Sequence, residues 1–155
     1  MAKELTEGDK APAFTLPAEE GEVSLSDYAG KALVLYFYPK DDTSGCTKQA
    51  IAFSEHLDAF HKAGADVLGV SKDPVKKHAK FREKHGLTVP LASDDESFET
   101  LEAYGVWKEK SMYGRTYMGI ERSTFLIKDG KIVRAWRKVK VPGHVEEVLE
   151  AVRAL

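Results

Sequence analysis

An uninterrupted apolar run at residues 32–38, Ala-Leu-Val-Leu-Tyr-Phe-Tyr, constrains the fold more than any other segment of the chain. Such a run of β-prone residues predicts a buried strand. Residues 66–70, Asp-Val-Leu-Gly-Val, predict a second buried strand. Between the two, apolar residues recur at helical spacing and predict a helix over about residues 44–62, closed by Gly64. The members of this helical stripe are Cys46, Ala50, Phe53, Leu57 and Phe60.

The segments on either side of this unit carry recognisable turn and cap signals. Residues 14–16 and 23–25 flank a turn at Glu19-Glu20-Gly21 and predict an N-terminal hairpin. Asp73-Pro74 predicts a helix start, because aspartate is able to cap and proline suits the first turn. That helix is expected to end at His85-Gly86.

The second half of the chain predicts three further elements. A short helix carrying Phe98 and Leu101 is expected after a cap at Asp94 or Asp95, and residues 106–120 are expected to form a long, aromatic-rich loop. The clearest hairpin is predicted next, because Asp129-Gly130 separates two apolar strands at residues 123–127 and 132–136. A final helix after Pro142 should bury the face formed by Val145, Val148, Leu149 and Val152.

This order of elements predicts an α/β protein with a thioredoxin-like fold, in which helices cover both faces of a mixed central sheet. Its 155 residues suit one domain spanning residues 1–155. With 43% hydrophobic residues, 31% charged residues and a formal net charge of −2, the chain gives no support for binding nucleic acid or an anionic membrane. The N-terminus lacks an apolar signal region, so we expect a cytoplasmic protein.

Cys46 is the only cysteine, so the chain cannot form an internal disulfide. It stands in the first turn of the predicted helix, just after the buried strand 32–38. Unpaired backbone N–H groups and the helix dipole favour an anion at such a position, and they favour the thiolate form of a cysteine. Cys46 is therefore a candidate nucleophile.

Three residues close to Cys46 in the sequence and one much later in the chain would support a nucleophile at this position. The Thr43 hydroxyl is able to cap the helix or to face a substrate oxygen, and the amides of Gly45 and Cys46 offer fixed donors. Pro39 ends the strand and is able to wall the thiol without a competing N–H group. Arg122 opens a strand expected next to the central strands, so its fixed charge should reach Cys46.

The spacing Pro39-x-x-x-Thr43-x-x-Cys46, together with the later Arg122, resembles the peroxiredoxin signature. Residues 36–48, Tyr-Phe-Tyr-Pro-Lys-Asp-Asp-Thr-Ser-Gly-Cys-Thr-Lys, are more similar to the bacterioferritin comigratory protein, or peroxiredoxin Q, group. Residues 104–107 and 119–127 resemble later stretches of that group. The resemblance extends from about Gly8 to the C-terminus.

The resemblance implies a thiol peroxidase that reduces hydrogen peroxide and organic hydroperoxides through a sulfenic acid on Cys46. Thr43 and Arg122 would bind and polarise the peroxide, Pro39 and Gly45 would line its site, and no flavin, haem, selenium or metal cofactor would be needed. Many members carry a resolving cysteine where this chain has Ile51 or Phe81-Arg82. The chain therefore resembles a one-cysteine enzyme recycled by an external thiol such as thioredoxin, glutaredoxin or glutathione.

Simpler interpretations of the same residues remain open at the sequence level. A lone cysteine on an apolar stripe is often packing only, and a thioredoxin-like redox sensor or client-binding module would use Cys46 for mixed disulfides. The five histidines show no metal-ligand spacing with the cysteine. Residues 107–117 mix aromatic and basic side chains, but a loop near the active site is favoured over a nucleic-acid surface. A monomer is expected, and a dimer joined through Cys46 would need an exposed helix start.

Overall fold

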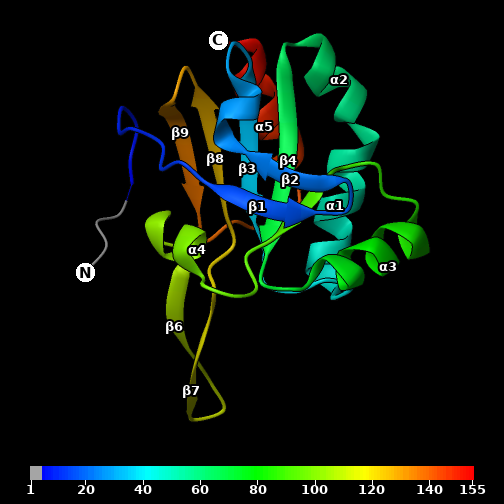
Figure 1. Cartoon of the computed structure of the whole chain (residues 1–155), viewed down its shortest axis with the longest axis vertical. Coiled ribbons are helices and arrows are strands. Elements are labelled where there is room, and N and C mark those ends of the chain that lie inside the picture. The colour runs from blue at the N-terminus through cyan, green and yellow to red at the C-terminus, as the bar shows by residue number, and fades with distance from the viewer. Residues whose placement is uncertain (1–4) are drawn as a thin grey trace.

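A seven-stranded mixed sheet forms the centre of the computed structural model, which describes residues 5–155 (Figure 1). In sheet order the strands are β2 (Gly21–Ser24), β1 (Thr15–Ala18), β5 (Leu91–Ser93), β4 (Ala65–Ser71), β3 (Ala32–Phe37), β8 (Ser123–Lys128) and β9 (Lys131–Arg137). The three central strands β3, β4 and β5 are parallel, whereas β8 and β9 continue the sheet antiparallel. The N-terminal hairpin β1–β2 joins the sheet at β5.

Helices cover both faces of the sheet, as the sequence predicts. They are the 3-10 helix η1 (Leu25–Tyr28) and the α-helices α1 (Ser44–Glu55), α2 (Leu57–Lys62), α3 (Val75–His85), α4 (Glu99–Ala103) and α5 (His144–Arg153). Strand β3 is buried on both faces, with Val34 and Tyr36 packed against α1, α2, α3 and α5. On the other face, Leu35 and Phe37 pack against α4 and the N-terminal segment. The expected mixed α/β fold is confirmed.

Several local predictions are confirmed by the backbone. Asp129 and Gly130 have positive φ angles of 53° and 75°, which the tight turn between β8 and β9 requires. Gly86 ends α3 in the left-handed conformation, with φ 62°. The apolar stripe of α5 is buried, as expected for Val145, Val148, Leu149 and Val152.

The prediction of one continuous helix over residues 44–62 is wrong, because the helix is interrupted at His56. The ring Nδ1 of His56 lies 2.9 Å from the carbonyl oxygen of Ala52, which also accepts the backbone N–H of His56. This local side-chain bond competes with the regular helical pattern. The helical spacing of apolar residues continues through His56, so the sequence pattern does not reveal the break.

The prediction of a loop at residues 106–120 is also wrong. Strands β6 (Trp107–Met112) and β7 (Arg115–Ile120) form a separate antiparallel hairpin that projects from the body of the molecule beside α4 (Figure 1). Tyr113 and Gly114 turn the chain with φ angles of 53° and 77°. Most of the hairpin is exposed, so it has no buried face to impose the apolar alternation from which strands are predicted.

The predicted helix caps are replaced by other contacts. Pro74, not Asp73, is the N-cap residue of α3, and the Asp73 carboxylate instead accepts the backbone N–H of Asp41 at 2.7 Å. Phe98 is the N-cap residue of α4, although the Asp94 carboxylate accepts the N–H of Leu101 at 3.0 Å.

Within residues 5–155, no helix has the length and apolar character that crossing a membrane requires.

Candidate active site

Cys46 lies in the first turn of α1, as its sequence position predicts. The chain leaves β3 at Phe37, crosses a loop and enters α1 at Ser44. At the start of α1 the backbone N–H of Thr47 donates to the Thr43 carbonyl at 2.8 Å, so the amides of the residues between them precede the helical ladder. Cys46 is only 2% exposed. Its sulfur therefore sits at a positive helix end with little water around it.

Arg122 reaches the thiol from the neighbouring strand. The antiparallel register joins Phe37 of β3 to Ser123 of β8, so the residue before Ser123 meets the end of β3. The Arg122 Nη2 group donates to Cys46 Sγ at 3.2 Å, and Nη1 donates to Gln49 Oε1 at 2.5 Å. Gln49 is fully buried one turn after Cys46. The guanidinium is thus held in one orientation by two bonds to α1.

Gly45 makes room for this guanidinium. A Cβ atom at Gly45 would lie 3.2 Å from Arg122 Nη2, a distance that forces one of the two groups to move. The absence of a side chain therefore lets Arg122 approach the thiol closely. The sequence motif indicates a role for the backbone N–H group of Gly45 but gives no sign of this contact with Arg122.

Thr43 and Pro39 belong to the loop between β3 and α1. Thr43 is the N-cap residue of α1, but its side chain makes no cap hydrogen bond. The Thr43 hydroxyl instead donates to the Lys40 carbonyl at 2.9 Å, so its remaining lone pairs can accept a bond from solvent or substrate. Thr43 is exposed and Pro39 is half-buried. The structure brings Cys46, Gly45 and Arg122 together, with Thr43 and Pro39 in the adjoining loop.

Lys110 on β6 is a second cation that sequence reasoning did not select. Burial and then the charge of Arg122 lower the pKa of Lys110, while Glu121 and Cys46 oppose this effect. Its side chain lies across Gly119, where a Cβ atom would meet Lys110 Cδ at 3.2 Å. No motif marks Lys110, because its approach depends on the β6–β7 hairpin that the sequence did not predict.

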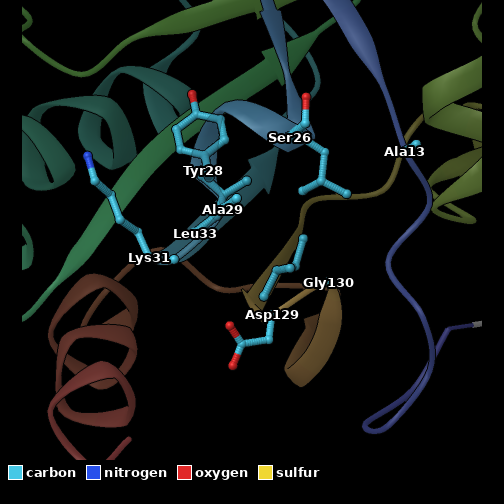
Figure 2. Close-up of a pocket in the computed structure, with 11 residues that line it drawn as sticks. Ala13, Ser26, Tyr28, Ala29, Lys31, Leu33, Asp129 and Gly130 are labelled. Atoms are coloured by element: carbon cyan, nitrogen blue, oxygen red, sulfur yellow. The ribbon is translucent and has the colours of Figure 1, made fainter.

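A well-formed apolar hollow lies away from this site. Figure 2 shows it between η1 and the turn that joins β8 to β9. Its volume is about 350 Å³. Leu33, near the start of β3, lines the hollow, whereas Cys46 follows the far end of the same strand. Burial, Asp66 and Asp27 raise the pKa of Tyr28 in its wall to about 12. The residues that line this hollow do not include Cys46, Arg122 or Thr43.

Metal-ligating side chains do not gather in the part of the chain that the structure describes. Among residues 5–155, no group of three or more His, Cys, Asp or Glu side chains is arranged to hold a metal ion.

Comparison with known proteins decides the family. Residues 7–136 match the AhpC/TSA family. The chain belongs to that family. It is 51% identical to peroxiredoxin Bcp of Bacillus subtilis over 148 residues, which cover 94% of each chain. It is 46% identical to peroxiredoxin Bcp of Escherichia coli, again over 94% of each chain.

Solved peroxiredoxin structures have the same fold. The TM-score is 0.91 with a Xylella fastidiosa peroxiredoxin Q mutant, at 45% identity over 99% of this chain and 98% of that one. It is 0.85 with Xanthomonas campestris peroxiredoxin Q, at 49% identity over 91% and 90% of the two chains. The recognition of a peroxiredoxin of the Bcp, or peroxiredoxin Q, group is confirmed, as is the thioredoxin-like fold. The protein is a thiol peroxidase, and its single cysteine makes it a one-cysteine type.

Proposed function

We propose that this peroxiredoxin reduces hydrogen peroxide and small organic hydroperoxides by direct attack of the Cys46 thiolate. The sulfur bonds to the terminal peroxide oxygen while the O–O bond breaks, which leaves a sulfenic acid on Cys46 and an alkoxide or hydroxide. A proton then converts the leaving oxygen to alcohol or water. Sulfur is oxidised by two electrons, and the peroxide is reduced by the same two.

The observation that carries this proposal is the 3.2 Å contact between Arg122 Nη2 and Cys46 Sγ. A fixed guanidinium beside the sulfur favours the thiolate and is able to donate to the oxygen that gains charge during attack. Gln49 supports the orientation of Arg122 without a charge of its own. The positive charge therefore remains available to the thiolate and to the peroxide.

The roles proposed for the other site residues follow from their positions. The Thr43 hydroxyl donates to Lys40, so we assign it as acceptor of the peroxide O–H group. The Gly45 and Cys46 amides at the start of α1 would donate to the peroxide oxygens. Pro39 offers no N–H group to compete and would limit the access of water to the sulfur.

The range of substrates is supported by a relative. A solved structure of Xanthomonas campestris bacterioferritin comigratory protein, 48% identical to this chain, is described in terms of its alkyl peroxide reduction activity. We therefore extend the proposed substrates from hydrogen peroxide to alkyl hydroperoxides.

The sulfenic acid must be recycled by a thiol from outside the chain, because Cys46 is the only cysteine. Two external thiols would restore the Cys46 thiol and release water and one disulfide. Thioredoxin, glutaredoxin and glutathione are the candidate reductants, and their presence in reducing compartments suits a cytoplasmic enzyme. We propose a monomer, with a dimer joined through a disulfide between two Cys46 residues as the alternative.

The deciding experiment is stopped-flow mixing of reduced protein with hydrogen peroxide, followed by mass spectrometry of trapped Cys46. We expect fast, stoichiometric formation of sulfenic acid, its absence in Cys46→Ser, and a much slower reaction in Arg122→Ala. Arg134→Ala is the matched control, because Arg134 lies on β9 over the ring of Trp136. Oxidation of the wild type at the rate of a free thiol would contradict the proposal.

Turnover separates the enzyme from a redox sensor. With dithiothreitol present, repeated consumption of peroxide is expected from an enzyme, whereas a sensor would be oxidised once and then stall. A protein that stalls after one oxidation with every thiol supplied would support the sensor or client-binding function instead.

A further inference from the structure

The loop that carries Pro39 and Thr43 is anchored on α3 and the segment before it. Residues 38–43 link β3 to α1. At the middle of this loop Asp41 is only 2% exposed, which is unusual for a carboxyl group. Its partners come from His78 on α3 and from Asp73 just before α3. The position of the loop is therefore set by contacts distant in the sequence.

Asp41 forms the buried centre of this anchor. One carboxyl oxygen lies 2.6 Å from His78 Nδ1, and the other accepts the Tyr38 hydroxyl at 2.5 Å. The far side of the imidazole, Nε2, lies 2.9 Å from the Ala92 carbonyl oxygen on β5. His78 and Tyr38 are at most 1% exposed. The three side chains thus fasten the loop to the core of the protein.

The partners fix the number of protons in the anchor. A carbonyl oxygen only accepts, so His78 Nε2 carries a proton and donates to Ala92. One further proton lies between His78 Nδ1 and the Asp41 carboxyl group. Whichever atom holds that proton, the pair has no net charge. A hydrogen-bonded pair without net charge is suited to a buried structural role.

Three other contacts hold the same loop. The backbone N–H of Asp41 donates to the Asp73 carboxylate, which also accepts the Ser71 hydroxyl at 2.8 Å. Asp42 has a positive φ of 61° and is held by Lys84 at 2.7 Å and His85 at 2.8 Å at the end of α3. A non-glycine residue in this conformation is kept there by its surroundings.

We propose that His78 is a positioning residue for peroxide reduction, acting through Asp41 on the loop that holds Pro39 and Thr43. The inference rests on the proposed function of that loop. Asp41 stands two residues after Pro39 and two before Thr43. Release of the anchor would move both residues relative to Cys46, and a displacement of about 1 Å can cost about a hundredfold in rate.

The first set of variants separates position from charge. His78→Leu removes the anchor and should lower the second-order rate constant for hydrogen peroxide at least about tenfold. Asp41→Asn keeps the anchor in a neutral form, because its amide is able to donate to neutral His78 while its oxygen accepts from Tyr38. This variant should retain the wild-type rate within about twofold.

A second pair serves as a matched control that does not depend on the folding of His78→Leu. Tyr38→Phe removes the hydroxyl that donates to Asp41 at 2.5 Å and lies 3.4 Å from His78 Nδ1. Tyr104→Phe removes a hydroxyl that donates to the Pro12 carbonyl at 2.6 Å. Only Tyr38 belongs to the anchor. Tyr38→Phe should lower the second-order rate constant for hydrogen peroxide about threefold or more, whereas Tyr104→Phe should leave it unchanged.

Alkylation of Cys46 by iodoacetamide provides the readout that loss of stability alone would not give. Alkylation needs the thiolate but not the peroxide-binding groups of the loop, so its rate should not fall in folded variants whose peroxide rate falls, and it should rise where a displaced Pro39 uncovers the sulfur. Circular dichroism identifies the folded variants. The wild-type peroxide rate, measured alongside, tests the proposed function separately from the anchor.

The inference is overturned by any of three results. The first is an unchanged peroxide rate in folded His78→Leu or, if that variant does not fold, equal rates in the two tyrosine variants. The second is an equal fall in peroxide and alkylation rates, which would mean that the anchor acts on the thiolate. The third is an Asp41→Asn variant as slow as His78→Leu, which would mean that charge, not position, matters.

Discussion

Gly45 and Gln49 flank Cys46 on α1, and both of them act on Arg122. Gly45 leaves the space into which the guanidinium fits, and Gln49 holds its other end. A carboxylate in place of the Gln49 amide would neutralise part of the charge of Arg122. The uncharged amide keeps that charge directed at the sulfur.

Gly45→Ala should lower activity without lowering stability. The added Cβ would displace Arg122 from the thiol, so the second-order rate constant for peroxide should fall at least about tenfold. Alanine favours the helical conformation by up to about 1 kcal/mol over glycine, so the free energy of unfolding should stay equal or rise. Stopped-flow oxidation and urea unfolding measure the two effects. A normal rate would show that the guanidinium adapts to the methyl group.

His144 should make the protein less stable in mild acid. Burial, with a contribution from Arg122 opposed by Glu147 and Glu146, lowers the pKa of His144 from 6.5 to about 4. Between those values the unfolded chain binds a proton that the folded protein does not, so stability is retained above pH 6.5 and is lost as the pH falls towards 4. At about 1.4 kcal/mol per pKa unit, the loss approaches about 3 kcal/mol.

Thermal unfolding between pH 7 and 4.5 tests this pH dependence. His144→Gln keeps a neutral partner for the Thr124 hydroxyl, which lies 2.9 Å from His144 Nε2, and should decline less in melting temperature over this range. Parallel declines in the two proteins would show that other groups set the acid sensitivity.

At the scale of elements, the sequence predicts what is buried better than what is exposed. Strand β3, the start of α1 and the β8–β9 hairpin have strong local signals, and the signature motif links Cys46 to Arg122. The β6–β7 hairpin, the break at His56 and the approach of Lys110 have none. The hairpin is mostly exposed, so its strands show no apolar alternation, and the break at His56 comes from one side-chain bond to Ala52 that the apolar spacing does not record. The position of Lys110 depends in turn on that hairpin.

The two hairpin turns should differ in their effect on stability. Gly130 and Gly114 have nearly the same φ, 75° and 77°, and a Cβ atom at either would meet no neighbour within 4 Å. An L residue in this conformation costs about 1–2 kcal/mol. Gly130→Ala strains the central sheet, so global unfolding in urea should shift by about that amount. Gly114→Ala strains a projecting hairpin that can deform locally, so a smaller shift is expected. Equal shifts would mean that both hairpins unfold with the core.

At the scale of the whole molecule, a single buried cysteine must be oxidised and recovered without an internal partner. The resemblance to the peroxiredoxin Q group implies a resolving cysteine at Ile51 or at Phe81-Arg82 in many members, whereas here Ile51 and Phe81 pack in the core around α1 and α3. The sulfenic acid formed on Cys46 therefore persists until an external thiol arrives or a second peroxide reacts.

Excess peroxide without a reductant should inactivate the enzyme. We expect mass spectrometry to show Cys46 with two added oxygen atoms, and we expect thiols to fail to restore activity, because sulfinic acid is not reduced by them. Dithiothreitol supplied together with the peroxide should protect the enzyme. Full recovery after excess peroxide, with a disulfide-linked dimer on a non-reducing gel, would show that a second copy resolves the sulfenic acid.

The antiparallel union of β3 with β8 also has a consequence for synthesis on the ribosome. The nucleophile is made in the first third of the chain, but Arg122 belongs to a strand made much later. In a nascent chain, Cys46 should therefore react with peroxide no faster than a free thiol until β8 emerges and pairs with β3. This delay would protect Cys46 from oxidation while the chain is still being synthesised. Alkylation of Cys46 in stalled chains of increasing length should change abruptly at that point, and a gradual change would contradict this view.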